Sequence, residues 1–154
     1  MEAMYSVIVC CRSSNWQSVI KRELGRSLPE AQLVTATDLD SAVQGVTEFQ
    51  LRGEPVVLLV ELQPRSVDVD AAQIWGATQH WSTAAVFAVG AAELGPWSSL
   101  LRCCGLIDYC LLPHQFSTLI PAIEKFFQLY PAVRSIEEQV WRRLPWKRRA
   151  VSLR

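Results

Sequence analysis

The sequence Pro55-Val56-Val57-Leu58-Leu59-Val60-Glu61-Leu62 contains an unbroken apolar run that lies between two turn signals, Arg52-Gly53-Glu54 and Gln63-Pro64-Arg65-Ser66. No residue from Val56 to Val60 offers a polar face, so both sides of this segment must be covered. Such a pattern is typical of a central strand in a parallel sheet that is flanked by helices. Glu61 then falls at the C-terminal end of the strand, where open α/β sheets place their functional groups.

Four more short apolar runs and five helical patterns surround this strand. Further strands are expected at 5–11, 32–35, 83–89 and 107–112, and helices at 14–24, 38–51, 68–81, 96–104 and 117–127. Ser14, Asp38 or Asp40, and Ser117 are the expected N-caps of three of these helices. The alternation of strand and helix predicts a doubly wound, five-stranded parallel sheet with right-handed crossovers and helices on both faces.

Length and composition indicate one globular domain with a core of its own. The chain has 154 residues, of which 50% are hydrophobic and 19% are charged. No apolar run approaches the roughly 20 residues that span a bilayer, and the first residues carry no basic segment of the kind that begins a secretory signal. Five cysteines, an odd number, favour reduced thiols in a cytoplasmic protein over a disulfide framework.

The net charge of zero conceals an acidic body and a basic C-terminal tail. Residues 1–141 contain all 15 acids, whereas residues 142–154 contain no acid and the bases Arg142, Arg143, Lys147, Arg148, Arg149 and Arg154. We therefore expect an α/β domain over 1–130, an amphipathic helix over 131–146 that packs on or beside it, and a basic, disordered tail over 147–154. Ser135 and Glu138 form the capping box of that extra helix.

The fifth strand–helix unit contains Gly105-Leu106-Ile107-Asp108-Tyr109-Cys110-Leu111-Leu112-Pro113. With this stretch, the five units resemble the receiver domain of bacterial two-component response regulators. In that family the fourth helix ends in a glycine shortly before an acidic-aromatic pair, and a lysine-proline closes the strand that follows. Pro64, after the central strand, also fits. The resemblance covers residues 4–129 and implies a flavodoxin-like sheet with the strand order 2-1-3-4-5.

The resemblance also implies a phosphorylation site whose residues this chain lacks. The family uses two acids that hold magnesium after the first strand, a phosphorylatable aspartate after the third, a hydroxyl side chain after the fourth, and a lysine before the proline. The acidic pair falls here on Cys11 and Arg12, or on Cys10 and Cys11; the aspartate falls on Glu61 or Val60, the hydroxyl on Val89 or Gly90, and the lysine on Leu112. Magnesium demands oxygen ligands, so neither pair suits it, and we expect no metal and no cofactor.

Two interpretations of Glu61 follow from this comparison. A glutamate in place of the acceptor can act as a built-in mimic of the phosphorylated state, although the hydroxyl and the lysine that respond to such a charge are missing. In the other interpretation, Glu61 is a solvated carboxylate at the end of the sheet and is paired with Arg12 across the strand ends.

The other candidate residues have weaker patterns. Cys10 and Cys11 are adjacent, so in a strand they face opposite sides, and they form no Cys-x-x-Cys motif. A thiol at Cys11 can be activated by the charge of Arg12, or both cysteines are small core residues. His80 and His114 have no second histidine at metal-ligand spacing. Four tryptophans at element ends or in the tail are either interface anchors or covers for the rims of the sheet: Trp81, Trp97, Trp141 and Trp146.

The sequence therefore predicts a non-catalytic receiver-like domain that acts in signal transduction by binding another protein, a second copy of itself included. Receiver-like domains usually present the fourth helix, the fifth strand and the fifth helix to partners. By resemblance, that face contains Trp97, Leu101, Tyr109 and Phe116. The alternative functions are nucleic-acid binding or regulation through Arg142, Arg143, Lys147, Arg148 and Arg149, and a thiol-based activity at Cys11.

Overall fold

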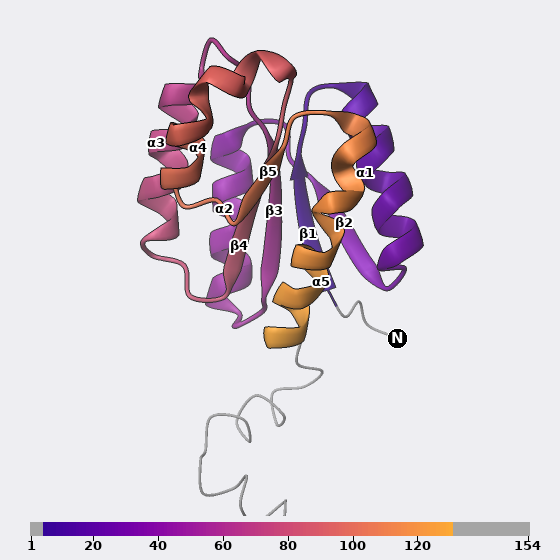
Figure 1. The fold of residues 1–154 in the computed structure, drawn as a ribbon. Coiled ribbons are helices and arrows are strands. Elements are labelled where there is room, and N and C mark those ends of the chain that lie inside the picture. The colour runs from indigo at the N-terminus through magenta and orange to yellow at the C-terminus, as the bar shows by residue number, and fades with distance from the viewer. Residues whose placement is uncertain (1–4, 131–154) are drawn as a thin grey trace, which may run out of the picture.

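Figure 1 shows a computed structural model of the chain, which describes residues 5–130. The strands are β1 (Tyr5–Cys10), β2 (Ala31–Thr35), β3 (Val56–Glu61), β4 (Ala84–Val89) and β5 (Asp108–Cys110). The helices are α1 (Ser14–Ser27), α2 (Leu39–Leu51), α3 (Val67–Thr78), α4 (Ser98–Cys103) and α5 (Ile120–Leu129), with the 3-10 helices η1 (Ala92–Trp97) and η2 (Pro113–Thr118). The helix expected at 131–146 and the tail at 147–154 lie outside the described residues.

The sheet has the predicted topology. All five strands are parallel, and their order is β2-β1-β3-β4-β5. β3 lies at the centre, where Cys10 of β1 pairs with Val60 and Val89 of β4 pairs with Glu61. Residues 56–59 have no exposed surface, which is the two-sided cover that an apolar strand requires.

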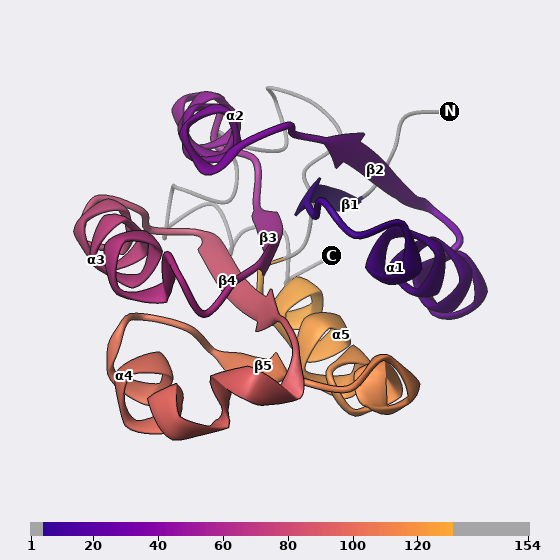
Figure 2. The same ribbon diagram turned by 90° about the horizontal axis from the view of Figure 1, so that it is seen from above.

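Helices cover both faces of the sheet, as the view from above in Figure 2 shows: α1 and α5 lie on one face, and α2, α3 and α4 on the other. Successive β3 side chains point to opposite faces, so Leu59 enters the core beneath α1 and α5 with Phe127, and Leu58 enters the core beneath α2 and α3 with Ile74. Within residues 5–130, no helix combines the length and the apolar character needed to cross a membrane.

The N-cap of α1 is Ser13, and the prediction of Ser14 is wrong. Ser13 has an extended backbone (φ −73°, ψ 126°), and its hydroxyl accepts a hydrogen bond from the Trp16 amide at 3.4 Å. The sequence also predicts a capping box of Ser14 with Gln17, and this does not form, because the side-chain amide of Gln17 donates to the carbonyl of Cys11 at 2.6 Å. Contacts with the preceding strand thus move the helix start by one residue.

The other two predicted caps have different outcomes. Asp38 caps α2, as predicted, by accepting a hydrogen bond from the Ser41 amide at 2.7 Å. Ser117 does not cap α5, because it lies inside η2, and α5 begins at Ile120 after Leu119. The chain therefore enters its last helix through a tighter turn than the sequence pattern suggested.

The segment from 92 to 112 is more irregular than predicted. The expected helix at 96–104 is divided into η1 and the short α4, and Pro96 lies inside η1. The expected strand at 107–112 is reduced to the three residues of β5. β5 lies at the edge of the sheet beside β4 alone, and natural edge strands are often short. Gly105 has φ +94°, the left-handed conformation that suits a glycine just after a helix.

Gln50, near the end of α2, connects two loops at the N-terminal edge of the sheet. Its Oε1 accepts hydrogen bonds from the amides of Ser82 and Thr83 at 3.1 and 2.8 Å. Its Nε2 donates to the carbonyls of Glu54 and Thr83 at 3.2 and 3.0 Å. One side chain thus satisfies the backbone before β3 and before β4.

Gln50→Ala should lower the free energy of unfolding by about 1–3 kcal/mol, because the substitution leaves part-buried backbone groups without partners. Urea unfolding followed by circular dichroism measures this change. Gln128→Ala, at an exposed position of α5, is the matched control and should change the value by less than about 0.5 kcal/mol. Equal unfolding midpoints for the two variants would contradict this role of Gln50.

Candidate functional site

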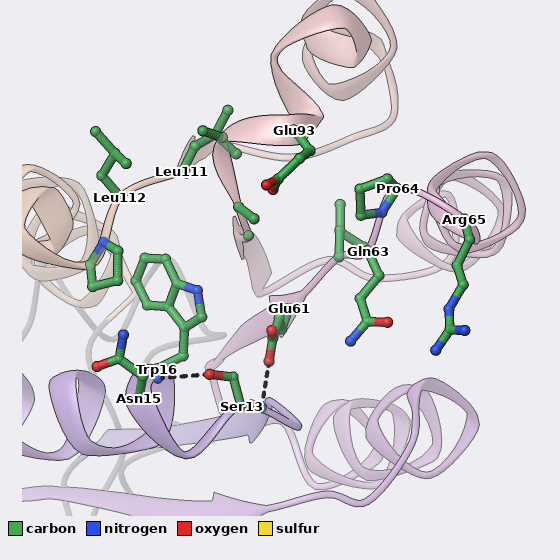
Figure 3. Close-up of a pocket in the computed structure, with 15 residues that line it drawn as sticks. Ser13, Asn15, Trp16, Glu61, Gln63, Pro64, Arg65, Glu93, Leu111 and Leu112 are labelled. Carbon is green, nitrogen blue, oxygen red and sulfur yellow. Dashed lines mark hydrogen bonds between the residues drawn. The ribbon is translucent and has the colours of Figure 1, made fainter.

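A cavity of about 690 Å³ lies at the C-terminal ends of the strands (Figure 3). Loops that follow four strands form its wall: Ser13 and Trp16 after β1, Glu61–Arg65 after β3, Gly90–Glu93 after β4, and Leu111–Pro113 after β5. Ligand sites of open α/β sheets lie at this edge. The cavity is therefore the candidate functional site.

The carboxylate of Glu61 forms the central polar contact of this site. Its Oε1 accepts hydrogen bonds from the backbone amides of Arg12 at 2.9 Å and Ser13 at 2.8 Å, and the contact to Ser13 is visible in Figure 3. The sheet register explains this contact. Cys10 pairs with Val60, so the next residue of β3 lies beside the turn that follows β1. Glu61 thus joins the end of β3 to the start of α1, which we call the Glu61 tie.

The predicted pairing of Glu61 with Arg12 occurs through a different group. The backbone amide of Arg12 makes the contact, and the guanidinium does not. Ion pairs within residues 5–130 join Arg22 and Arg26 to Glu23, and Arg52 to Glu54. The sequence pattern pointed to the guanidinium of Arg12 as the partner. The actual donors are backbone amides, which every residue except proline carries.

Aliphatic groups surround the Glu61 tie on the side of β4 and β5. Val89, the last residue of β4, is fully buried, and Leu94 of η1 is 1% exposed. Gly90 leaves no room for a side chain, because a Cβ there would collide with the Leu94 side chain and would lie 3.0 Å from the Leu62 carbonyl. Leu112 follows β5 and is 37% exposed. These positions offer no hydroxyl and no ammonium group.

The side chains at this edge do not fit a divalent metal ion. A second cavity of about 450 Å³ adjoins the first and is lined by Cys10, Arg12, Asp38, Asp40 and Asp70 among others. Within residues 5–130, no three His, Cys, Asp or Glu side chains form a group that could hold a metal. Glu61 already accepts two amide hydrogen bonds, and a thiol and a guanidinium next to it are unsuited to magnesium.

Two solved structures superpose on this chain with probability 1.00. A response regulator from Thermotoga maritima superposes with a TM-score of 0.61 over 80% of this chain and 98% of its own, at 16% identity. A CpaE2 pilus assembly protein from Sinorhizobium meliloti superposes with a TM-score of 0.55 over 79% of this chain and 99% of its own, at 18% identity. The chain has a receiver-like fold. No protein-family model and no curated protein sequence matches it.

The predicted partner face of this receiver-like domain is only partly accessible. Leu101 is 1% exposed and Phe116 is fully buried, so both belong to the core and cannot contact a partner directly. Trp97 is 37% exposed, and the guanidinium of Arg102 lies over the Tyr109 ring, 5.9 Å from its centroid. Sequence analysis missed Arg102, although its place in the last turn of the fourth helix put it near the fifth strand.

Cys10 and Cys11 face opposite sides of the receiver-like sheet, as predicted. Burial raises the pKa of Cys10 to about 11. Burial, with the Glu61 carboxylate adding to it, raises the pKa of Cys11 to about 12. Both thiols therefore stay protonated near neutral pH. The predicted activation of Cys11 by Arg12 is wrong, because desolvation dominates at this position.

The remaining candidates lie elsewhere. His80 follows α3 and His114 lies in η2, and neither histidine lines the two cavities beside Glu61. Trp81 donates its indole N–H to the hydroxyl of Thr47 at 3.4 Å, which favours a structural role at the rim. Trp141, Trp146 and the bases Arg142, Arg143, Lys147, Arg148 and Arg149 lie outside the described residues.

We expect a maleimide at pH 7 to modify the folded chain at Cys103 alone, because Cys103 is exposed and the other four cysteines are buried. Intact mass spectrometry counts the adducts. Cys103→Ser should take up none until urea unfolds the chain, after which the buried thiols react. An adduct on Cys11 in the folded Cys103→Ser variant would restore the hypothesis of a reactive thiol.

Proposed function

We propose that this chain is a non-catalytic receiver-like signalling module that has lost its phosphorylation site and acts by binding another protein. The single observation that carries the proposal is the Glu61 tie. Its carboxylate accepts hydrogen bonds from the Arg12 and Ser13 amides, and so needs no cation to stabilise it at the end of β3. The receiver-like fold supports a role in signalling.

The neighbours of Glu61 support the loss of phosphoryl chemistry. A transferred phosphoryl group needs cations or donors aimed at its oxygens. By resemblance, those groups would stand at Cys11, Arg12, Val89 or Gly90, and Leu112. An aliphatic side chain at Leu112 donates no hydrogen bond, and neither thiol nor guanidinium holds magnesium. The proposal therefore assigns the cavity no catalytic role.

The Glu61 tie gives the module one fixed arrangement instead of two. Hydrogen bonds to a charged group contribute about 1.5–3 kcal/mol where they are buried, and less where solvent competes, as it does at Arg12. This contribution is present at all times, because no added group or ion creates it. We therefore infer a constitutive binding module, closer to a permanent mimic of one signalling state than to a switch.

The surface formed by α4 and β5 is the proposed partner face. Its accessible groups are Trp97, Arg102 and Tyr109, with Asp108 at the exposed edge of β5. Aromatic and arginine side chains are enriched among the residues that dominate protein interfaces. A second copy of the chain is one of the partners that this face could bind. The proposal places the protein in the cytoplasm, in keeping with free cysteines in the described part of the chain.

Nucleic-acid binding has less support. The C-terminal edge of the sheet offers no basic patch, because five carboxylates and only two arginines line its two cavities. A nucleic-acid backbone would be repelled by this negative edge. Binding through Arg142–Arg149 stays a prediction, since these residues lie outside the described part of the chain.

Acetyl phosphate with magnesium should leave the mass of the folded chain unchanged, because the thiol, guanidinium and aliphatic groups at Cys11, Arg12 and Leu112 supply neither magnesium ligands nor a lysine. Intact mass spectrometry checks this, with an ordinary receiver domain treated in parallel as the positive control. Glu61→Asp restores the shorter carboxylate and should also remain unmodified. A stable phosphoryl adduct on the wild-type chain would contradict the loss of the phosphorylation site.

Arg102→Glu should weaken the capture of a native partner by about 10-fold or more, because the variant reverses a charge at the centre of the proposed face. Affinity capture from the native organism with quantitative mass spectrometry identifies proteins whose enrichment depends on this residue. Lys21→Glu makes the same charge reversal on α1, away from the face, and should retain the partner. The partner face would be refuted if Lys21→Glu lost the captured partner while Arg102→Glu retained it.

A further inference from the structure

Carboxylates gather at the C-terminal edge of the sheet without basic partners to match them. The first cavity is lined by Glu61 and Glu93, and the second by Glu61, Asp38, Asp40 and Asp70; we call these five the edge carboxylates. Arg12 and Arg65 are the bases that line the two cavities. In Figure 3, Arg65 extends away from Glu93. The edge therefore retains a net negative charge.

Neutral groups donate hydrogen bonds to three edge carboxylates besides Glu61. Asp40 accepts from the side-chain amide of Gln73 at 2.6 Å, and Asp70 from the hydroxyl of Ser66 at 3.1 Å. The amide of Ser41 lowers the pKa of Asp38. Hydrogen bonds from neutral groups favour the ionised carboxylate without cancelling its charge. Such an edge attracts a cationic partner.

Two acids elsewhere in the described structure form ion pairs with bases. Glu23 pairs with Arg22 and Arg26, and Glu54 pairs with Arg52. None of the ion pairs within residues 5–130 involves an edge carboxylate. The edge carboxylates therefore keep their charge free of ion pairs with the bases of residues 5–130.

The C-terminal segment of the chain complements this edge in both charge and apolar character. Residues 142–154 contain six bases and no acid, and Leu144-Pro145-Trp146 precedes Lys147-Arg148-Arg149. The first cavity combines its carboxylates with an apolar wall that includes Leu112 and Pro113. Aromatic and basic groups in one segment suit a site in which acids and apolar side chains are mixed.

The segment is long enough to reach this edge. α5 runs back along the sheet and ends near the N-terminal edge (Figure 1), where the ring of Phe127 lies 4.6 Å from that of Tyr5 at the start of β1. A strand of six residues spans about 20 Å between the two edges. The 12 residues from 131 to 142 span up to about 40 Å when extended. Even a partly helical connection covers the distance.

We propose that residues 142–154 fold back onto the C-terminal edge of their own chain and dock over the two cavities through their bases. The docked segment neutralises the edge carboxylates and covers Glu61. Its bases are then not free to bind nucleic acid. The docking is intramolecular, and it does not depend on whether Glu61 or any other residue is phosphorylated.

Paramagnetic broadening of amide signals tests the proposal on the full chain. In a Cys103→Ser background, Ala150→Cys carries the nitroxide, since the remaining cysteines are buried. Amides at 63, 65 and 90–93 should lose intensity, whereas those at 53–54 and 82–83, at the opposite edge, should not. The loss should be present near 0.01 M salt, where the Debye length is about 30 Å, and absent near 1 M, where it is about 3 Å. Equal broadening at both edges, or none, would overturn the proposal.

Two matched variants locate the docking site. Asp40→Asn with Glu93→Gln removes two exposed charges from the C-terminal edge and should reduce the broadening there. Glu30→Gln with Glu48→Gln removes two exposed charges near the opposite edge and should leave it unchanged. An equal effect of the two pairs would mean that the tail senses only net charge, and would refute a site at this edge.

A mixed sample separates docking within one chain from docking on a second copy. Unlabelled ¹⁵N chain is combined with nitroxide-labelled ¹⁴N chain at low salt. The ¹⁵N signals should keep their intensity, because the label then sits only on other molecules. Broadening in this sample would assign the segment to a second copy and overturn the intramolecular proposal. Retention on heparin that requires residues 142–154, together with no broadening in the first experiment, would show a free tail and overturn it as well.

Discussion

The burial of β3 on both faces is the constraint on which the rest of this structure depends. Residues 56–59 have no exposed surface, and each fully buried aliphatic side chain contributes about 1.5–3 kcal/mol. A strand without a polar face is stable only between two layers of helices, and it must have a neighbour on each side. The central position of β3 therefore determines that Glu61 stands in the middle of the C-terminal edge.

At that edge, one carboxylate takes the role of a connector. The Glu61 tie joins β3 to the turn that begins α1, and the aliphatic groups of Leu94 and Leu112 fill the space on the other side. A carboxylate satisfied by backbone amides stabilises a fixed geometry and needs no ion. The aliphatic groups on the side of β4 and β5 contribute no hydrogen-bond donor to this edge.

Opposite charges lie in two regions of this chain. The solved structures that superpose on the chain are 16% and 18% identical to it, and this likeness shows the architecture alone. Function depends on particular residues. The C-terminal edge holds five carboxylates with two arginines, while the last 13 residues hold bases and no acid. Two regions of opposite charge in one chain attract each other at an effective concentration that separate molecules rarely reach.

The sequence by itself determined the order of the elements, the strand order through its resemblance to receivers, and the two-sided cover of β3, because hydrophobic periodicity is a local property that the chain carries at every position. It also narrowed the cap of α2 to Asp38 or Asp40, and it placed Glu61 at the C-terminal end of the central strand. Tertiary structure alone decided what these residues meet. Ser13 replaced Ser14 as a cap, and Leu101 and Phe116 became core residues.

At the candidate site, too, the sequence supplied the residues and the tertiary structure decided their partners. Cys11 is a protonated core thiol because burial outweighs the charge of its neighbour, and burial is a property of the assembled sheet. The partners of Glu61 are backbone amides 48 and 49 residues away in the sequence. No side-chain pattern marks such donors, since every residue except proline has one. Only the pairing of β1 with β3 brings them to the carboxylate.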